Sequence, residues 1–271
     1  MKDITKNNDI PHFTSFDDDF SLIEFYHENS KRFFYSSDID FSTRPPPFKE
    51  YLDCNLRIPL PSTSNFRVDL TIDKAILYRR SCRNFVNRPV SLEALSKILY
   101  FGYGVTGSVY YDNVEVLTRP CPSGGALYPY EIYPIVFNVD GIEAGIYHYS
   151  PLDHFLELLK KGEFTKQVIE LFLKQPHIAN SSVCIILSAI IKRTAWKYGA
   201  RGYRHILLEA GHLVQNMCLL STAEGLGTLT LGSFDDNSLA RFLDLDPVYE
   251  PVIYGLITGY RNKGVQTGAQ E

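Results

Sequence analysis

The longest periodic stretch of the chain, Tyr203 to Glu224, most constrains how the chain can fold. Apolar side chains recur there every three or four residues, at Ile206, Ala210, Leu213, Val214, Met217 and Leu220. This spacing predicts an α-helix of about six turns with one broad apolar face. Gly225 follows, and glycine commonly ends a helix because it adopts the left-handed conformation without steric cost. Such a helix has to be covered by a second layer of structure.

Shorter patterns on both sides of this helix alternate between helix and strand. Helices are predicted for Leu70 to Arg79, for Ser91 to Tyr100 with Ser91 as the N-cap, and for Thr165 to Lys174. Strands are predicted for Ile132 to Val139, Ala144 to Tyr149, Val183 to Ile191, Leu226 to Leu231 and Val252 to Thr258. Asp140-Gly141 predicts a two-residue hairpin turn, because both positions of such a turn need positive φ. The mixture indicates an α+β protein and not a doubly wound sheet.

Composition excludes several other classes of protein. The chain is 45% hydrophobic and 21% charged, which is typical of a folded domain and excludes general disorder, collagen and coiled coil. A net charge of −4 gives no basic field, so we expect neither nucleic acid nor an anionic membrane as a partner. The longest apolar run, Val183 to Ile191, is about half of what spans a bilayer.

The cysteines and the N-terminus indicate the compartment. The chain has five cysteines, an odd number, and none of them forms a Cys-x-x-Cys pair. The first residues lack the apolar stretch that an export signal needs. Reduced thiols in the cytoplasm are therefore expected.

The N-terminal part of the chain has a different surface from the rest. Residues 1–53 hold 11 acidic and 6 basic side chains, and Phe20 to Phe34 could form an aromatic-rich helix. The prolines of Thr43 to Phe48 and of Pro59 to Ser64 make stiff breaks. We therefore expect an N-terminal extension over residues 1–68 and a main domain over residues 69–271.

The segment Arg79-Arg-Ser-Cys-Arg83 is the first that could perform chemistry. Arg79, Arg80 and Arg83 bring three guanidinium groups to the end of an apolar helix. If the chain is extended here, Arg79, Ser81 and Arg83 point the same way. Two guanidinium groups and a hydroxyl on one side suit a phosphate, which arginine binds through two parallel hydrogen bonds. A solvated basic patch is the equally simple alternative.

The loop Arg119-Pro-Cys-Pro-Ser-Gly-Gly-Ala-Leu-Tyr-Pro129 is the second. Its glycines let backbone N–H groups approach an anion or a flat ring closely, and its prolines hold it rigid. It lacks the Gly-Lys-Ser/Thr ending of a phosphate-binding Walker loop. We favour a binding loop over a structural turn, because a turn does not require eleven such residues.

The third segment, Ala195 to Arg204, leads into the long helix. Lys197 and Tyr198 are adjacent there, and burial and mutual charge can bring such a pair toward neutral pKa values suited to acid/base catalysis. Taken alone, an exposed loop with Trp196 as an aromatic plug is the simpler interpretation.

Other chemistries find little support. Glu209 and His212, like Glu24 and His27, have the Glu-x-x-His spacing of di-iron bundles, but the strands argue against an all-α bundle. A structural role, with Glu209 capping His205 and His212 on one helix face, is favoured, and no metal is expected. The chain has no Gly-x-Ser-x-Gly nucleophile elbow, and the three glycines of Gly102 to Gly107 have the wrong spacing for a dinucleotide fingerprint.

Together the three segments resemble one family. Arg79 to Phe85 resembles the flavin-phosphate motif of the nitroreductase fold, and Pro122 to Glu131 is similar to its SagB/ThcOx-type branch, also called McbC-like oxidoreductases. Tyr203 to Glu224 and Gly225 to Gly232 resemble the dimer helix and the flavin-edge strand. The resemblance covers residues 69–263 approximately. It implies a nitroreductase-like α+β fold, with a mainly antiparallel central sheet flanked by helices.

The resemblance also implies a homodimer that binds FMN at the subunit interface. The residues that it assigns to the cofactor are Arg79, Arg80, Ser81 and Arg83 at the phosphate and ribityl chain, Pro122, Ser123 and Gly124 from the other subunit, Leu231 and Gly232 at the reactive edge of the ring, and Arg261 as a late phosphate contact. Lys197 and Tyr198 stand where azoline oxidases of this branch have a Lys-Tyr pair. Cys121 departs from the pattern, because serine is expected there.

The implied activity is FMN-dependent oxidation of peptide thiazolines or oxazolines to thiazoles or oxazoles in natural-product biosynthesis. The implied partners are an azoline-containing peptide and a cyclodehydratase, and the acidic segment that ends at Phe25 to Ser30 resembles the extension of this branch and could dock either one. Two alternatives stay open. One is an NAD(P)H-dependent nitro- or quinone reductase of the same fold, and the other is a flavin-free scaffold protein.

Overall fold

The computed structural model describes residues 19–31, 43–54, 56–111 and 114–262. The helices are α1 Asp19–Asn29, α2 Ile72–Tyr78, α3 Leu92–Tyr103, α4 Thr165–Leu171, α5 Ile191–Tyr198, α6 Arg201–Ala223 and α7 Asp236–Phe242. The strands are β1 Arg57–Pro59, β2 Phe85–Val86, β3 Gly107–Tyr111, β4 Val114–Thr118, β5 Tyr130–Val136, β6 Gly145–Ser150, β7 Phe155–Lys161, β8 Val183–Ala189, β9 Leu226–Leu231 and β10 Val252–Arg261. Short 3-10 turns lie at Thr63–Asn65, Gly124–Ala126 and Pro176–Asn180.

The chain divides into two units, residues 1–39 and residues 40–271. In the first, α1 is shorter than the helix expected over Phe20 to Phe34, whose last residues lie outside the described part of the chain. The side chain of Asn29 donates a hydrogen bond to the Phe25 carbonyl at 2.7 Å and so closes the last turn.

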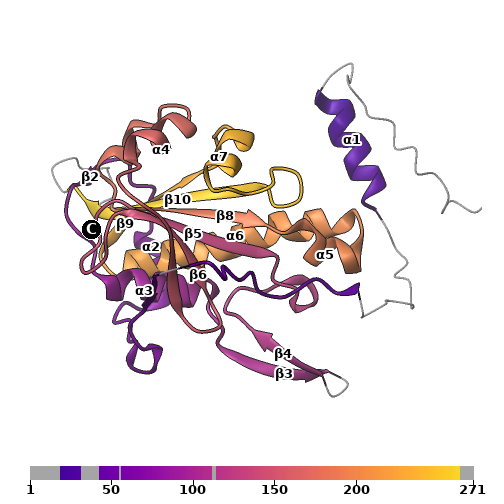
Figure 1. The fold of residues 1–271 in the computed structure, drawn as a ribbon, viewed down its shortest axis with the longest axis horizontal. Helices are drawn as coiled ribbons and strands as arrows, with labels where there is room; N and C mark the ends of the chain where they lie inside the picture. The colour runs from indigo at the N-terminus through magenta and orange to yellow at the C-terminus, as the bar shows by residue number, and fades with distance from the viewer. Residues whose placement is uncertain (1–18, 32–42, 55, 112–113, 263–271) are drawn as a thin grey trace, which may run out of the picture. The chain divides into compact units, whose positions relative to one another are not determined.

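An eight-stranded sheet organises the second unit (Figure 1). Its order is β1-β7-β6-β5-β8-β10-β2, with β9 paired to β10, and every pairing between these strands is antiparallel. The expected α+β fold with an antiparallel central sheet is confirmed. Because β1 pairs with β7, residues 57–59 form an edge of this sheet. A separate hairpin, β3 and β4, stands beside it.

Helices cover both faces of the sheet. Along β8, Val183, Ile185 and Leu187 pack with α3 and α6, whereas Cys184 and Ile186 pack with α4 and α7. This alternation follows from the period of two in a strand, and it explains why β8 reads as a continuous apolar run. The predicted apolar face of α6 is buried as expected.

Two expectations about local structure are wrong. The connection between β5 and β6 is not a two-residue turn but residues 137–144, because the N–H of Asp140 donates to Val90 instead of closing the hairpin. The region around Lys197 is not a loop, because residues 191–198 form α5. Gly199 ends that helix at φ 55°, and Gly202 allows α6 to approach α5 closely.

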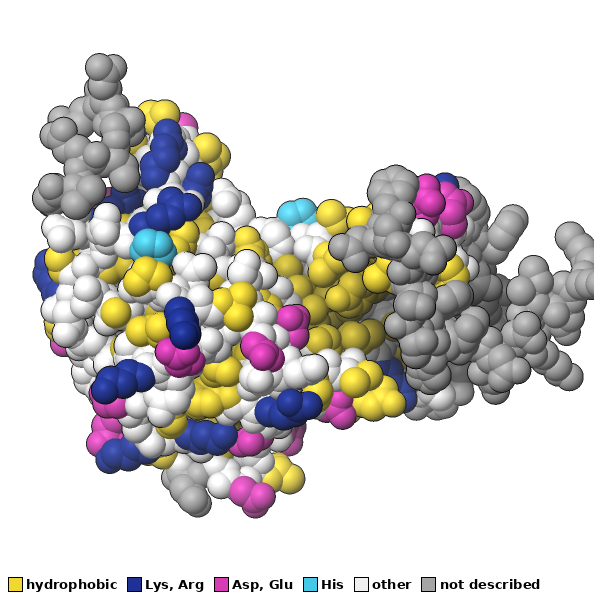
Figure 2. Space-filling model, turned by 90° about the horizontal axis from the view of Figure 1, so that it is seen from above, with side chains coloured by type: hydrophobic (Ala, Val, Ile, Leu, Met, Phe, Trp, Pro, Cys, Tyr) yellow, Lys and Arg dark blue, Asp and Glu magenta, His cyan; other side chains and the backbone are white. Residues whose placement is uncertain are grey.

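The surface and the thiols agree with the composition. Acidic and basic side chains are interspersed over the lower part of the face in Figure 2. The five cysteines are free thiols. Within the described ranges, no helix is both long enough and apolar enough to cross a membrane.

A buried charge network joins α5 to the sheet. Arg193 of α5 lies 2.6 Å from Glu131 of β5, and His148 bridges Glu131 at 2.7 Å and Glu157 at 2.8 Å. The hydrogen bond from His148 and the charge of Arg193 outweigh burial and lower the pKa of Glu131 to about 2. Arg193 also donates to the Pro46 carbonyl at 2.8 Å, so one side chain holds three segments together.

Replacing Arg193 should therefore destabilise the fold. In Arg193→Met a buried carboxylate loses its cation, and we expect a loss of about 3–5 kcal/mol in the free energy of unfolding at pH 7, measured in urea. Arg57→Met is the matched control, because Arg57 is half exposed and 3.4 Å from Glu157, and it should cost less than about 1 kcal/mol. Equal losses in the two variants would contradict the assignment.

Candidate cofactor and active site

The Arg79–Arg83 segment leaves the helix as predicted. Arg79 takes extended backbone angles at the end of α2, Ser81 bridges to Thr228 of β9, and the N–H of Cys82 donates to the Thr228 carbonyl at 2.7 Å. The segment therefore runs along the edge of β9. Arg80 turns back to donate to the carbonyls of Leu77 and Arg79, so it also caps α2.

Arg261 joins this segment from the end of β10. A hollow of about 60 Å³ is lined by Arg80, Ser81, Cys82, Arg83, Asn84, Arg261 and Asn262. The side chain of Arg261 lies over Gly227, where an added Cβ would come within 2.7 Å of Arg261 Cγ. Arg261 Nε is buried and has no acceptor among the described residues. A buried donor without a partner is costly, so the hollow suits an anionic group such as a phosphate.

A second hollow adjoins the first at Arg83. Its volume is about 160 Å³, and it is lined by Arg83, Gln175, His177, Leu229, Thr230, Leu231, Gly232 and Ser233. His177 Nδ1 donates to the Arg83 carbonyl at 2.8 Å and fixes the shared wall. The structure thus brings together the predicted residues Arg80, Ser81, Arg83, Leu231, Gly232 and Arg261. We call these two hollows the arginine cleft.

The Arg119–Pro129 loop and the Lys-Tyr pair lie against each other. The Tyr128 N–H donates to Ser123 Oγ at 3.0 Å, and the chain turns at Gly125 with φ 64°. A Cβ added to Gly125 would lie 2.7 Å from the Tyr198 hydroxyl and 3.2 Å from Lys197 Nζ. Glycine at this position therefore lets the loop close onto both side chains. We call the residues 122–125, 197 and 198 the Lys-Tyr cluster.

His205 completes the cluster and was not predicted. Its ring lies 4.8 Å from that of Tyr198, and Gly124 is in contact with it. His205 Nε2 is buried without a hydrogen-bond partner in the described chain. Burial and the charge of Arg201 lower its pKa. The imidazole is therefore kept neutral, and no described carboxylate stabilises its charged form. A neutral imidazole can either accept or donate a proton.

Glu209 does not cap His205 as expected but lies behind the loop. The Tyr103 hydroxyl donates to Glu209 Oε1 at 3.4 Å, and Ser123 also hydrogen-bonds to this carboxyl. Burial raises the pKa of Glu209 to about 7. One sequence signal could have indicated that Glu209 is buried: it stands directly before Ala210, within the apolar stripe of the helix.

The two groups of residues lie near different parts of α6. The Tyr198 ring contacts His205, whereas the charge of Arg79 acts on Cys218, whose pKa burial raises. Thirteen residues separate these two points, which is about 20 Å along a helix. Figure 1 accordingly shows α5 at one end of the sheet and α2 and β9 at the other. The Lys-Tyr cluster and the arginine cleft of one chain thus do not form one site.

The fold that carries the arginine cleft and the loop is that of a class of oxidoreductases. The model of the nitroreductase family matches residues 76–260, and the chain belongs to this family. An inferred nitroreductase of Methanocaldococcus jannaschii is 36% identical over 177 residues, which cover 65% of this chain and 86% of that protein. The microcin B17-processing protein McbC of Escherichia coli is 33% identical over 138 residues, covering 47% of this chain and 49% of McbC.

Solved structures share the fold. An inferred nitroreductase from Anabaena variabilis has a TM-score of 0.72 at 26% identity, covering 88% of this chain and 46% of that one. A chain of the E. coli microcin synthetase McbBCD complex with truncated pro-MccB17 bound has a TM-score of 0.59 at 22% identity, covering 90% and 93%. An inferred nitroreductase from Desulfovibrio desulfuricans in complex with FMN has a TM-score of 0.53 at 18% identity, covering 75% and 93%.

Glu209 should make stability depend on pH. Its carboxyl is protonated in the folded protein up to about pH 7 but ionises near pH 4.5 when unfolded, so its contribution to stability falls as pH rises from 4.5 to 7. Glu209→Gln should remove this loss, which is about 3 kcal/mol. Urea unfolding at pH 5 and pH 8 measures it, with exposed Glu163→Gln as the control. A wild-type-like pH dependence in Glu209→Gln would refute the assignment.

Proposed function

We propose that the protein is an FMN-dependent dehydrogenase that oxidises thiazoline or oxazoline rings in peptides to thiazoles or oxazoles. The observation that carries the proposal is the contact of Lys197 and Tyr198 with the loop at Gly125. This contact puts a proton-transfer pair beside the loop that the family resemblance assigns to the flavin. The similarity to McbC, a microcin B17-processing protein, supports a peptide as the substrate.

The arginine cleft fits FMN. Arg83 and Ser81 suit the phosphate and the ribityl chain, and Arg261 offers a buried donor that lacks an acceptor. Backbone at Leu231 and Gly232 borders the adjoining hollow, where a flat ring can lie. Backbone at Pro122, Ser123 and Gly124 would approach the ring from the second subunit. FMN, when bound, supplies the oxidant by accepting a hydride from the azoline ring.

The chain's own residues supply the proton transfer. The α-carbon of an azoline is bonded to a carbonyl carbon and to the imine nitrogen of the ring, so its proton is acidic and a positioned base can remove it, while the neighbouring ring CH₂ gives up the hydride. Together with the hydride, its loss removes two hydrogens and two electrons from the ring. Lys197 Nζ lies 5.6 Å from the centre of the Tyr198 ring, and the two groups share the acid and base roles. The His205 ring packs against Tyr198 at a tilt and holds that ring in place.

The separation of the two groups of residues supports a homodimer. Since one chain places its arginine cleft about 20 Å along α6 from its Lys-Tyr cluster, we propose that a second copy completes each site. Apolar side chains for such a contact are exposed on α2 and on α6, which packs against it: Ile72, Ile76, Leu77, Leu207 and Leu208. Two helices with these side chains suit an isologous interface.

Residues 1–68 are proposed as an extension that docks the peptide or a cyclodehydratase. A cyclodehydratase makes azolines from Cys, Ser or Thr, so it supplies the substrate of the proposed reaction. The fold shared with a chain of the McbBCD synthetase complex supports an assembly of this kind.

Loss of Arg261 should weaken FMN binding. In Arg261→Met the buried donor is gone, and we expect the Kd for FMN to rise about tenfold or more, since hydrogen bonds to charged groups contribute about 1.5–3 kcal/mol. Quenching of flavin fluorescence measures it on protein freed of flavin. Arg241→Met on α7, outside the cleft, should bind like the wild type. An unchanged Kd in Arg261→Met would remove Arg261 from the cofactor site.

Loss of Lys197 or Tyr198 should slow the reaction and leave FMN bound. We expect Lys197→Ala and Tyr198→Phe to lower kcat for a synthetic thiazoline peptide by about 10²–10⁴-fold, the usual contribution of a general acid or base. A two-hydrogen mass loss in the peptide measures the reaction, and the flavin spectrum measures binding.

The electron donor separates this function from its main alternative. The identity with the M. jannaschii relative favours a nitro- or quinone reductase as the second candidate. Rapid bleaching of the flavin by NADPH, with none by the thiazoline peptide, would establish that alternative and overturn the proposal. A colourless protein that does not take up FMN would instead support a scaffold.

A further inference from the structure

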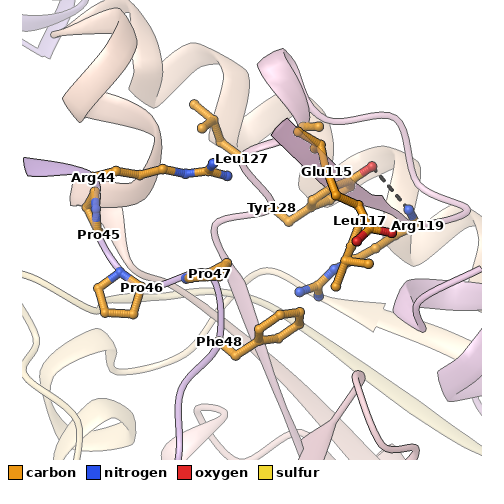
Figure 3. Close-up of a pocket in the computed structure, with 12 residues that line it drawn as sticks. Arg44, Pro45, Pro46, Pro47, Phe48, Glu115, Leu117, Arg119, Leu127 and Tyr128 are labelled. Atoms are coloured by element: carbon orange, nitrogen blue, oxygen red, sulfur yellow. Dashed lines mark hydrogen bonds between the residues drawn. The ribbon is translucent and has the colours of Figure 1, made fainter. Parts of the chain in front are cut away.

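A cavity of about 330 Å³ is lined by the loop residues that follow Gly125 (Figure 3). One wall is the proline run with its flanking residues, Arg44 to Phe48, and the opposite wall is β4 from Glu115 to Leu117. Arg119 and the loop residues Ala126 to Tyr128 close it. Its volume is at the lower end of the range for ligand pockets. No part of the proposed flavin chemistry uses it.

Arg119 lies in this cavity among three aromatic rings. Its guanidinium lies 4.1 Å from the centre of the Tyr103 ring, 5.1 Å from that of Tyr128 and 5.4 Å from that of Phe48. Figure 3 shows the group between Tyr128 and Phe48, directed into the cavity. The residue is only 8% exposed. Cation–π contact with these rings does not use the N–H groups of the guanidinium, so its N–H edge is left for a ligand.

That edge is largely without acceptors. Among the described residues, Nη1 donates one hydrogen bond, to the Tyr103 carbonyl at 3.5 Å, and no described carboxylate forms an ion pair with Arg119. Glu209 is the buried acid that interacts with the charge of Arg119. Because its pKa is raised to about 7, it is partly protonated near neutral pH and offsets only part of the guanidinium charge. Glu115 on the opposite wall is exposed and would repel an anion. Taken together, these charges leave the Arg119 guanidinium as a buried cation that faces the cavity.

The cavity is tied to the Lys-Tyr cluster by direct hydrogen bonds. The backbone N–H of Arg119 donates to the Tyr128 hydroxyl at 3.1 Å, and the backbone N–H of Tyr128 donates to Ser123 Oγ. On the proline side, the Pro46 carbonyl accepts from Arg193 of α5, the helix that ends at Lys197 and Tyr198. A group bound in the cavity would thus be held at a fixed distance from the proton-transfer pair.

We propose that this cavity binds a carboxylate of the peptide substrate through Arg119, and so positions the peptide beside the Lys-Tyr cluster. The inference rests on the proposed function for the peptide, but not on the redox step. A guanidinium edge matches a carboxylate through two parallel hydrogen bonds, and the proline and leucine walls suit the apolar part of the ligand. The carboxylate belongs either to an acidic side chain or to the C-terminus of the peptide.

Three matched peptides test the cavity without turnover. The first is acetyl-Gly-Phe-Gly-Glu-Gly-amide, the second has Gln in place of Glu, and the third has that Gln and a free C-terminal carboxylate. We expect one of the two carboxylate peptides to bind the full chain, loaded with FMN, at least about tenfold more tightly than the neutral one in calorimetric titration. The first or the third peptide identifies the source of the carboxylate. Equal Kd values for all three would overturn the proposal.

Variants tie the preference to the cavity. Arg119→Gln should abolish the difference in Kd, and exposed Arg241→Gln should keep it. Because Arg119 is buried, replacing it could unfold the protein, so Leu117→Trp serves as a second variant. The larger side chain fills the cavity from the β4 wall and should also abolish the difference in Kd. A carboxylate preference that survives in a folded Arg119→Gln or Leu117→Trp protein would overturn the assignment.

The outcomes for the cavity and for the proposed function are separable. A carboxylate preference without azoline oxidation refutes the dehydrogenase and leaves the cavity standing. Azoline oxidation by a protein that binds all three peptides equally refutes the cavity alone.

Discussion

The ion pair between Arg193 and Glu131 is the interaction on which the active region depends. It is buried, and it joins α5 to the central strand β5, while the same guanidinium holds the carbonyl of Pro46. It ties both the helix that carries Lys197 and Tyr198 and the proline wall to the sheet through one guanidinium. Removing one partner of a buried pair leaves an uncompensated charge, so a substitution at either residue alone strongly destabilises the fold.

Much of the fold could be predicted, because its elements have strong local signals. The apolar stripe of α6, the N-cap Ser91 of α3 and the continuous apolar run of β8 each reflect a periodicity that the chain itself encodes. The Asp140-Gly141 turn failed because a long-range bond from Asp140 to Val90 outweighed a local preference. The helix α5 stands where an exposed loop was expected; Gly199 ends this helix, and Gly202 permits its close packing against α6.

The parts of the site that the sequence did not predict are those assembled from distant segments. Glu209 lies on a helix, Ser123 in a loop and Tyr103 at the end of α3, and only the folded chain brings their polar groups together. Arg119 was seen as one cation of a loop, but its stacking on three rings from three segments is a property of the tertiary structure. Family resemblance supplied the cofactor residues, and geometry added the buried donor of Arg261.

The three consecutive prolines that line the cavity have a consequence for affinity. Proline fixes φ near −65°, so this wall has little backbone freedom to lose when a ligand arrives. A flexible wall of the same shape would have to be ordered at the moment of binding, at a cost in free energy. The stiff proline break before the sheet thus also serves as a preorganised rim of the cavity. Its backbone conformational entropy is already lost on folding and is not lost again on binding.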